Sequence, residues 1–416
     1  MNLKAKTHSI VHYSIAFIYA IYQHTPTPPD DALSHCNQLI HQIKAEIEQQ
    51  TDGNGISFRR FMEMALYEPA LGYYVAGMRK IGASGDFTTA PEISSLFSQC
   101  LANQCKEVLQ HLDKASILEL GAGSGIMAVD ILKRLEHLNC LPESYYILDI
   151  SPELKQRQKA SLQKHIPHLL KKVIWLDQLP EEGFTGVILG NEVLDAMPVD
   201  WFSIKDNQIF NQHVIWKNDY FAIHPVPAKK TLQRQVEQLK IATFPDSASQ
   251  QVDYSSELNP NLNAWFKSIN QCLQQGVVLL IDYGYSRKEY YLPERTMGTL
   301  LCHYQHRCHN EVLIYPGLQD ITASVDFTAV AEAASDTGMD VMGFSNQATF
   351  LAASGLEALF MQALQDEPQQ QYKLAQQVRT LSLPAEMGER FKVIATAKDF
   401  PHPLSGFSLG DQRHRL

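Results

Sequence analysis

Short apolar runs alternate with amphipathic segments through the middle of the chain. Five of these runs predict buried strands: Ser116–Leu120, Tyr145–Ile150, Val173–Leu176, Gly186–Gly190 and Gly276–Ile281. In the segment 125–138, after the first run, apolar residues recur every three or four positions, which predicts a helix with one buried face. Strands that alternate with helices over this length are typical of a parallel sheet covered on both faces. The pattern therefore predicts a doubly wound α/β fold.

The patterns before and after this region extend the prediction at both ends. Three more helices are expected before the first strand: Ala32–Gln50, Phe58–Leu66 with Ser57 as its N-cap, and Ser94–Gln110. Near the C-terminus, the strand-like runs Val341–Ser345 and Phe391–Ala395 flank a helical stretch, 349–381. We expect these two runs to pair antiparallel and to close one edge of the sheet.

Two long connections interrupt the sheet pattern and predict a second, α+β lobe. Residues 201–223 alternate in polarity, with turn residues at 206–207 and 216–219, as expected for a β-meander, and a helix is predicted over Lys229–Gln238. The other connection is 285–325. The expected division is a peripheral extension (1–29), N-terminal helices with the first half of the core (30–199), an inserted lobe (200–265) and the remaining core with a second lobe segment (266–416).

Composition excludes several classes of protein. The chain has 416 residues, of which 45% are hydrophobic and 19% charged, the balance of a globular rather than a disordered protein. Its net charge of −10 argues against binding to duplex nucleic acid, which usually requires a basic surface, and is compatible with a basic protein substrate. The seven cysteines contain no C-x-x-C pair, so neither a metal cluster nor a redox dithiol is indicated.

The N-terminal segment Ile10–Tyr22 is apolar and aromatic, but its 13 residues are too few to span a bilayer. No small-residue cleavage site follows it, and no arginine occurs before Arg59, so the sequence supports neither a signal peptide nor a mitochondrial presequence. We therefore expect no membrane insertion.

The first predicted strand ends near Glu119 and leads directly into glycines at 121, 123 and 125. Glycine tolerates positive φ and has no Cβ, so a ligand can approach such a turn closely. The dinucleotide fingerprint G-x-G-x-x-G would place its third glycine at 126, where Ile126 stands. The pattern E-x-G-x-G-x-G, with Ala122 inside the turn, instead resembles the motif of S-adenosylmethionine (SAM) methyltransferases.

Acids at later strand ends extend this candidate site. Asp149 lies 28 residues after Gly121, where a carboxylate can accept hydrogen bonds from both hydroxyls of a ribose, and Ile150 follows it. The alternative is that Asp149 caps the helix that begins near Ser151. Asp177 could accept the adenine amino group or be an ordinary loop acid. Other polar residues predicted at this edge of the sheet are Asn191, Glu192 and Asp282.

Glu192 and Asp195 follow the fourth strand, the position that faces a transferred methyl group in this fold. Methyl transfer from a sulfonium mainly requires that the nucleophile be held in line and that water be excluded. Two carboxylates can grip a guanidinium and localise its charge away from the attacking nitrogen. The alternative is that Asp195 caps the next turn and Glu192 is structural. His303 and His306 are further candidates, either as bases and substrate contacts or as packing residues.

Several longer motifs match one family in order across roughly residues 32–410. They are FMEMALYEP and GYY within 61–74, GDFTTAPEIS at 85–94, LELGAGSG at 118–125, NE-x-x-DAMPV at 191–199, QHR at 305–307 and DIT-x-x-VDF at 320–327. With them the chain resembles the MidA-like SAM-dependent methyltransferases, whose mitochondrial members assist assembly of respiratory complex I. The resemblance implies a class I, Rossmann-like methyltransferase fold with an added lobe. For mitochondrial members it also implies methylation of an arginine on a complex I subunit.

The same resemblance assigns residues to the cofactor. The positions that it places at the methionine end of SAM are Glu119, Gly121, Gly123 and Gly125, with Asp149 at the ribose. The loop 85–94 would close over the cofactor through Thr88 and Glu92. Ala90 stands where many members have serine, which removes a hydroxyl without changing the path of the backbone.

The sequence thus predicts a SAM-dependent methyltransferase that acts on an arginine of a protein substrate. The alternatives are a small-molecule or O-methyltransferase with the same core, and an assembly factor that binds SAM or a partner without turnover. An NAD-dependent oxidoreductase is opposed by Ile126. A bacterial cytoplasmic location is expected, with the mitochondrial matrix as the alternative. No metal is expected, and the oligomeric state is left open, a dimer included.

Overall fold

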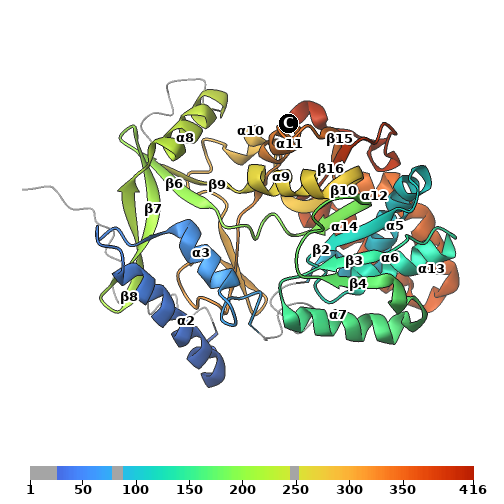
Figure 1. The fold of residues 1–416 in the computed structure, drawn as a ribbon, viewed down its shortest axis with the longest axis horizontal. Helices are drawn as coiled ribbons and strands as arrows, with labels where there is room; N and C mark the ends of the chain where they lie inside the picture. The colour runs from blue at the N-terminus through green and yellow to red at the C-terminus, as the bar shows by residue number, and fades with distance from the viewer. Residues whose placement is uncertain (1–25, 77–87, 244–252) are drawn as a thin grey trace, which may run out of the picture.

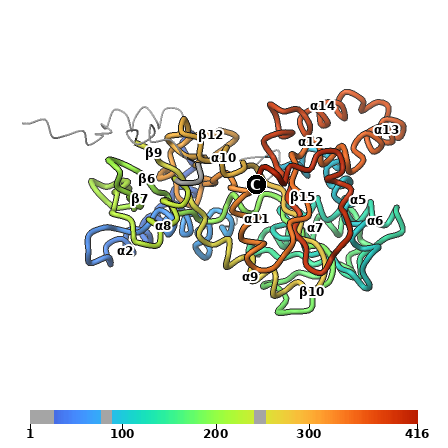
Figure 2. Tube along the Cα trace, turned by 90° about the horizontal axis from the view of Figure 1, so that it is seen from above, coloured from blue at the N-terminus to red at the C-terminus, as the bar shows by residue number. Residues whose placement is uncertain are grey.

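The computed structural model describes residues 26–76, 88–243 and 253–416. A larger α/β core and a smaller lobe lie side by side (Figure 1), and the view from above separates them in the same way (Figure 2). Most of the predicted extension 1–29, and the first part of the 85–94 loop, lie outside the described residues.

One mixed eight-stranded sheet forms the core, in the order β15-β16-β10-β5-β2-β3-β4, with β14 beside β10. Its strands are β2 (Ser116–Leu120), β3 (Tyr145–Leu148), β4 (Val173–Leu176), β5 (Phe184–Asn191), β10 (Leu273–Tyr285), β14 (Val325–Asp326), β15 (Asp340–Asn346) and β16 (Phe391–Lys398). The neighbours from β4 to β10 are parallel, whereas β16 runs antiparallel to both β10 and β15. This confirms the doubly wound sheet and its terminal antiparallel pair.

The middle of each central strand is apolar and buried because helices cover both faces of the sheet. Val187 and Ile188 are neighbours on β5 and point to opposite sides. Val187 joins an apolar core that includes Leu132 of α6 (Ile126–His137), whereas Ile188 joins one that includes Phe266 of α9 (Leu262–Cys272). The other helices that pack on these two cores are α5 (Ser95–His111), α7 (Pro152–His165), α11 (Phe327–Ser335), α12 (Gln347–Ala353), α13 (Leu356–Asp366) and α14 (Gln371–Ser382).

The lobe contains the predicted meander. Its first sheet has the order β1-β7-β6-β9, with β8 beside β7, and its second has the order β12-β11-β13. The strands are β1 (Ile56–Ser57), β6 (Asp200–Lys205), β7 (Gln208–Lys217), β8 (Tyr220–Pro227), β9 (Tyr254–Leu258), β11 (Leu301–Tyr304), β12 (Arg307–His309) and β13 (Asp320–Thr322). The two meander turns contain residues with positive φ at 206–207 and 218–219, which agrees with the predicted turn positions.

The N-terminal helices α2 (Asp30–Glu48) and α3 (Phe58–Tyr67) share an apolar core with the lobe sheets. Phe58, for example, packs edge-on against Trp201 of β6, with ring centroids 5.2 Å apart. Ser57 caps α3 as predicted, since its hydroxyl accepts from the Arg60 backbone N–H. The lobe therefore brings together segments from three separate parts of the chain.

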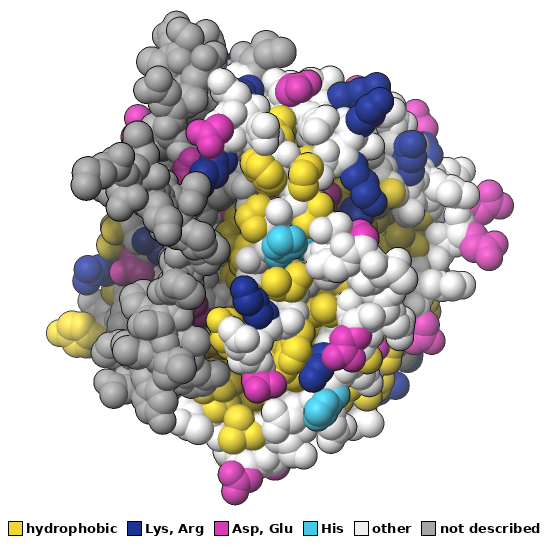
Figure 3. Space-filling model, turned by 90° about the vertical axis from the view of Figure 1, so that its left-hand side faces the viewer, with side chains coloured by type: hydrophobic (Ala, Val, Ile, Leu, Met, Phe, Trp, Pro, Cys, Tyr) yellow, Lys and Arg dark blue, Asp and Glu magenta, His cyan; other side chains and the backbone are white. Residues whose placement is uncertain are grey.

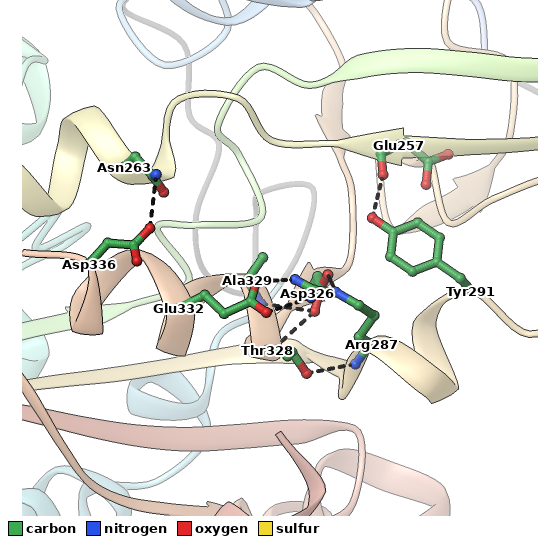
Figure 4. A network of polar contacts seen from close by, with 9 residues as sticks. All are labelled: Glu257, Asn263, Arg287, Tyr291, Asp326, Thr328, Ala329, Glu332 and Asp336. Atoms are coloured by element: carbon green, nitrogen blue, oxygen red, sulfur yellow. Dashed lines mark hydrogen bonds and ion pairs between the residues drawn. The ribbon is translucent and has the colours of Figure 1, made fainter. Parts of the chain in front are cut away.

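A polar network ties the second lobe segment to the core (Figure 4). Arg287 Nε lies 3.3 Å from Asp326 Oδ2, and Arg287 Nη1 donates to Glu332 Oε1 at 2.6 Å. Asp326 also accepts from two backbone N–H groups in the first turn of α11. The hydroxyl of Tyr291 donates to the carbonyl of Glu257 on β9, at 2.9 Å. These contacts fix the orientation of the lobe against the sheet.

The outer face of the lobe carries a band of hydrophobic side chains with charged ones around it (Figure 3). Among the described strands, β8 pairs only with β7 and is therefore an edge strand. Pro225 and Pro227 on β8 have no N–H to offer a further strand, which protects this edge from pairing with another chain. No described helix is both long and apolar enough to cross a membrane.

Candidate active site

A cavity of about 280 Å³ lies beyond the carboxyl ends of β2, β3 and β5. The strand order reverses between β2 and β5, which is where open α/β sheets bind ligands. The sequence-predicted residues that line the cavity are Glu92, Glu119, Gly121, Ala122, Gly123, Asp149, Ile150, Asn191, Glu192 and Asp195. The sequence-predicted residues that do not line it are Thr88, Gly125, Asp177 and His306.

The glycine turn after β2 has the backbone that its sequence predicts. Gly121, Gly123 and Gly125 have φ angles of 66°, 52° and 82°, a region that L side chains rarely adopt. Gly125 faces α7 rather than the cavity, and a Cβ at this position would lie 3.0 Å from the Cα of Gln158. Gly125 therefore serves the site indirectly, by letting α6 start close to α7.

We expect Gly125→Ala to lower the free energy of unfolding by about 2 kcal/mol, because it adds both a positive-φ penalty and a contact with Gln158. It should also weaken SAM binding. Gly338→Ala is the matched control, since φ there is +87° but no described atom lies within 4 Å of the added Cβ. Urea unfolding and calorimetric titration would measure both effects. Equal losses in the two variants would contradict the role of the contact.

Asp149 is held by the protein on both carboxylate oxygens. Oδ1 accepts from the Ser151 backbone N–H at 2.9 Å, and Oδ2 accepts from Gln158 Nε2 at 2.7 Å. Gln158 is fixed in turn by Trp175, whose Nε1 donates to Gln158 Oε1 at 3.0 Å. The N-cap of α7 is Ser151 and not Asp149, because the Ser151 hydroxyl accepts from Leu154 N–H. Each Asp149 oxygen can still accept a second hydrogen bond from a ligand.

Glu119 is buried beneath the glycine turn, with 1% of its surface exposed. Burial, with a smaller contribution from the nearby charge of Asp149, raises the pKa of its carboxyl group to about 7 despite the hydrogen bond from Tyr145, which lowers it. The Tyr145 hydroxyl donates to Glu119 Oε2 at 2.6 Å and holds this side chain in place. A positively charged ligand group in the cavity would favour the ionised form of Glu119.

The segment after residue 87 reaches the glycine turn. Glu92, on the short helix α4 (Ala90–Ile93), accepts a hydrogen bond from the hydroxyl of Ser124. Thr89 lines the cavity, whereas its neighbour Thr88 does not. The Thr89 side chain makes no capping hydrogen bond to α4 among the described residues. Helix capping therefore does not explain why a threonine stands at this position. Of the two loop residues predicted to contact the cofactor, Thr88 and Glu92, only Glu92 lines the cavity.

Asn191, Glu192 and Asp195 lie at the end of β5 and in the turn that follows. Glu192 has a φ of 54°, which is unusual for a residue other than glycine, and Asn191 Nδ2 donates to Glu192 Oε1 at 3.0 Å. Burial, together with the charges of Asp195 and Asp320, raises the pKa of Glu192 to about 8. Burial also raises the pKa of Asp195 to about 6. An unusual backbone angle and carboxyl groups with raised pKa values in one cavity are typical of functional sites.

The turn owes its shape to Asp282 on β10. Asp282 Oδ2 accepts from three successive backbone N–H groups, those of Val193, Leu194 and Asp195, at 3.2, 2.9 and 3.2 Å. Asp282 Oδ1 accepts from the Tyr283 backbone N–H at 2.9 Å. Asp282, predicted at this sheet edge, therefore lies behind the cavity and fixes the residues that face it.

Two predicted residues lie on the surface. The side chain of Asp177 is 97% exposed and pairs with Lys155. His306 is exposed in the turn between β11 and β12, with a φ of 62°. His303 lies on β11 in register with Asp320, and burial lowers its pKa. The structure brings none of these three side chains to the cavity lining.

Sequence reasoning missed several cavity residues from distant parts of the chain. Tyr67, Tyr74 and Asp320 line the cavity from the lobe side, and Trp265 lines it from α9. The tyrosine-rich turn at 67–74 and the DIT motif at 320–322 were visible in the sequence, but nothing in either pattern placed it at the site.

Comparisons with known proteins agree with this geometry. Residues 100–345 match the model of a family described as "Putative S-adenosyl-L-methionine-dependent methyltransferase". The crystal structure of a Burkholderia thailandensis protein, described as a "likely methyl transferase" bound to S-adenosyl-homocysteine, is 37% identical, covers 94% of this chain and 100% of its own, and has a TM-score of 0.88. A native structure from the same organism has a TM-score of 0.85 at the same identity and coverage.

More distant relatives are mitochondrial proteins of animals. The protein arginine methyltransferase NDUFAF7 of Danio rerio is 28% identical over 82% of this chain and 84% of its own length. The Drosophila melanogaster homologue is 27% identical over 92% of this chain and 91% of its own. With a family model that matches more than half of its length, and with a solved relative that is 37% identical over 94% of it, this chain belongs to the family of S-adenosyl-L-methionine-dependent methyltransferases.

Proposed function

We propose that this chain methylates a guanidinium nitrogen of an arginine in a protein substrate. The observation that carries the proposal is that Glu192 and Asp195 share one cavity with the glycine turn and Asp149. The names of the NDUFAF7 relatives, which are protein arginine methyltransferases, support the same substrate. The higher identity to a bacterial protein supports a bacterial cytoplasmic enzyme, whereas the mitochondrial relatives support the alternative, the mitochondrial matrix. The substrate would be a complex I subunit or its bacterial counterpart.

The residues of the cavity fit SAM, which supplies the activated methyl group when bound. The positive φ angles of Gly121 and Gly123 leave backbone accessible beside the cavity. Asp149 retains acceptor capacity for ribose hydroxyls, and Ile150, which is 55% exposed, offers an apolar surface next to it. Glu119 and Glu92 supply negative charge where a positively charged amino acid group would be favoured. We assign these residues to cofactor binding.

Glu192 and Asp195 would hold the acceptor. A guanidinium presents five N–H donors in one plane, and two carboxylates can accept from them and keep the attacking nitrogen in line. Transfer of a methyl group to this nitrogen must be accompanied by loss of one proton. Glu192, with a pKa near 8, is suited to receive it. A hydroxyl acceptor would not need this pair of carboxylates, which is why the arginine substrate is preferred to an O-methylated small molecule.

The raised pKa of Glu192 predicts a pH dependence. At pH 7 the carboxyl group is mostly protonated in the absence of acceptor, because its pKa of about 8 lies above that pH. The ionised form that binds a guanidinium becomes dominant as the pH rises through 8. We therefore expect kcat/KM for the acceptor to rise up to about tenfold per pH unit below pH 8 and to level off above it. A flat profile between pH 6.5 and 9 would contradict the assignment.

The experiment that tests the proposed function has two steps. Isothermal titration of the full chain with SAM, and with NAD as a control, tests the cofactor. Incubation of the chain with labelled SAM and bacterial lysate, followed by mass spectrometry, then tests whether the label appears on arginine. SAM binding with methylarginine formation supports the proposal. SAM binding with label only on other residues or on small molecules overturns the arginine substrate but not the family.

A further inference from the structure

We propose that the lobe supplies a cation-binding subsite, formed by Asp320, Tyr74 and Tyr67, that recognises the guanidinium of the acceptor. The inference rests on the proposed function and extends it, since it says which part of the chain selects the substrate. Asp320 is on β13, 2% exposed, and lines the same cavity as Glu192 and Asp195. The three carboxylates that we assign to the guanidinium therefore come from both sides of the cavity, Glu192 and Asp195 from the core and Asp320 from the lobe.

Tyr74 holds the carboxylate of Asp320 in one orientation. Its hydroxyl lies 2.9 Å from Oδ1 and 2.9 Å from Oδ2, and it donates to this carboxylate. Because one hydroxyl lies within hydrogen-bond distance of both oxygens, it orients the carboxylate, and a carboxylate oxygen can accept more than one hydrogen bond. A carboxylate fixed in this way is prepared for a planar donor group, which loses less entropy on binding than it would with a mobile side chain.

The two tyrosines form an aromatic wall beside Asp320. Their rings are stacked, with centroids 5.6 Å apart and an interplanar angle of 20°. The Tyr67 hydroxyl donates to the carbonyl of Ala196 at 2.8 Å, so this ring is also fixed. Ala196 directly follows Asp195, and Tyr67 thus connects the wall to the turn with the core carboxylates. Aromatic rings next to carboxylates favour a delocalised cation such as guanidinium, which is weakly hydrated and can stack.

The charges of the cavity and an unpaired acceptor in it point to a ligand with several donors. Within the described part of the chain, six acids line the cavity: Glu92, Glu119, Asp149, Glu192, Asp195 and Asp320. No described lysine, arginine or histidine lines it. Asn191 Oδ1 is buried and has no hydrogen-bond partner among the described residues. A buried acceptor without a donor is costly, so it indicates a donor that arrives with the ligand. A guanidinium offers enough N–H groups for both walls of the cavity at once.

The test uses the full chain saturated with S-adenosylhomocysteine. The probe is N-acetyl-arginine amide, and the citrulline compound, which has nearly the same shape but no charge, is its control. We expect the arginine probe to bind at least about tenfold more tightly than the citrulline probe, because charge-assisted hydrogen bonds are the strong ones. Asp320→Asn should remove most of this difference without changing the affinity for S-adenosylhomocysteine. Asp219→Asn, which removes an exposed lobe charge outside the cavity lining, should change neither affinity.

A second variant covers the case in which Asp320→Asn does not fold. Tyr74→Phe removes the hydroxyl that orients Asp320 and keeps the ring, and it should weaken arginine binding by about threefold to tenfold. Unchanged arginine affinity in the variant that folds would overturn the subsite alone, whereas equal affinity of the wild type for the two probes would overturn both the subsite and the arginine substrate. Failure of the wild type to bind S-adenosylhomocysteine would overturn the proposed function together with it.

Discussion

Replacement of Glu192 by glutamine is expected to leave SAM binding unchanged and to reduce methyl transfer by a factor of about 100 or more. Glutamine has nearly the same shape, and its carbonyl oxygen can still accept from Asn191 Nδ2, so the strained backbone at residue 192 should persist. What the variant loses is the negative charge that would grip the guanidinium and the basic group that would take its proton. The loss should therefore appear in kcat and in acceptor binding.

Calorimetric titration with SAM and single-turnover transfer of a labelled methyl group would separate the two effects. Glu237→Gln is a matched control, because Glu237 is an exposed glutamate on α8 (Lys230–Thr243) outside the cavity lining. The control should keep both properties. Equal turnover in Glu192→Gln and in the wild type would remove Glu192 from the proposed mechanism, whereas joint loss of SAM binding would indicate a structural role instead.

The parts of the fold that depend on local pattern could be predicted from the sequence. β2 and β4 have the predicted bounds, because an apolar run between polar breakers determines a buried strand. The turns at 206–207 and 218–219 followed from their Asp and Asn residues, which tolerate positive φ. The rule that ligands bind beyond the carboxyl ends of parallel strands predicts that Glu119, Asp149 and Glu192 lie close together, and all three line the cavity.

The rest of the site depends on contacts between distant segments. Tyr74 and Asp320 are 246 positions apart, and no local pattern shows that their side chains meet. Likewise, α2 and α3 belong to the lobe because they share an apolar core with strands that lie far away in the sequence, which no local pattern shows. His306 is the opposite case, because it stands in a family motif but lies in an exposed hairpin turn. A motif of this kind indicates that a position matters without showing whether it matters for chemistry or for the turn.

Asp282 was predicted at the sheet edge, but its place in the structure suggests support rather than contact with ligands. One of its oxygens holds three successive amides of the turn 193–195, and the other holds the amide of Tyr283. The carboxylate is 1% exposed, so water cannot easily replace it. Glu192 directly precedes this turn and has a positive φ. The position of Glu192 and Asp195 therefore depends on a side chain that does not line the cavity.

Asp282→Asn is expected to lower the free energy of unfolding by about 1 to 3 kcal/mol and to reduce kcat by a factor of about 10 to 100. Asparagine has a single acceptor oxygen, so it can serve the three amides or the Tyr283 amide but not both, and its NH₂ group must face the remaining donors. Asp340→Asn, at an exposed position on β15, is the control. Urea unfolding, titration with SAM and turnover would be measured for both. A purely structural role would lower stability and leave the kcat of the folded protein unchanged, whereas a positioning role requires that kcat fall while SAM affinity is kept.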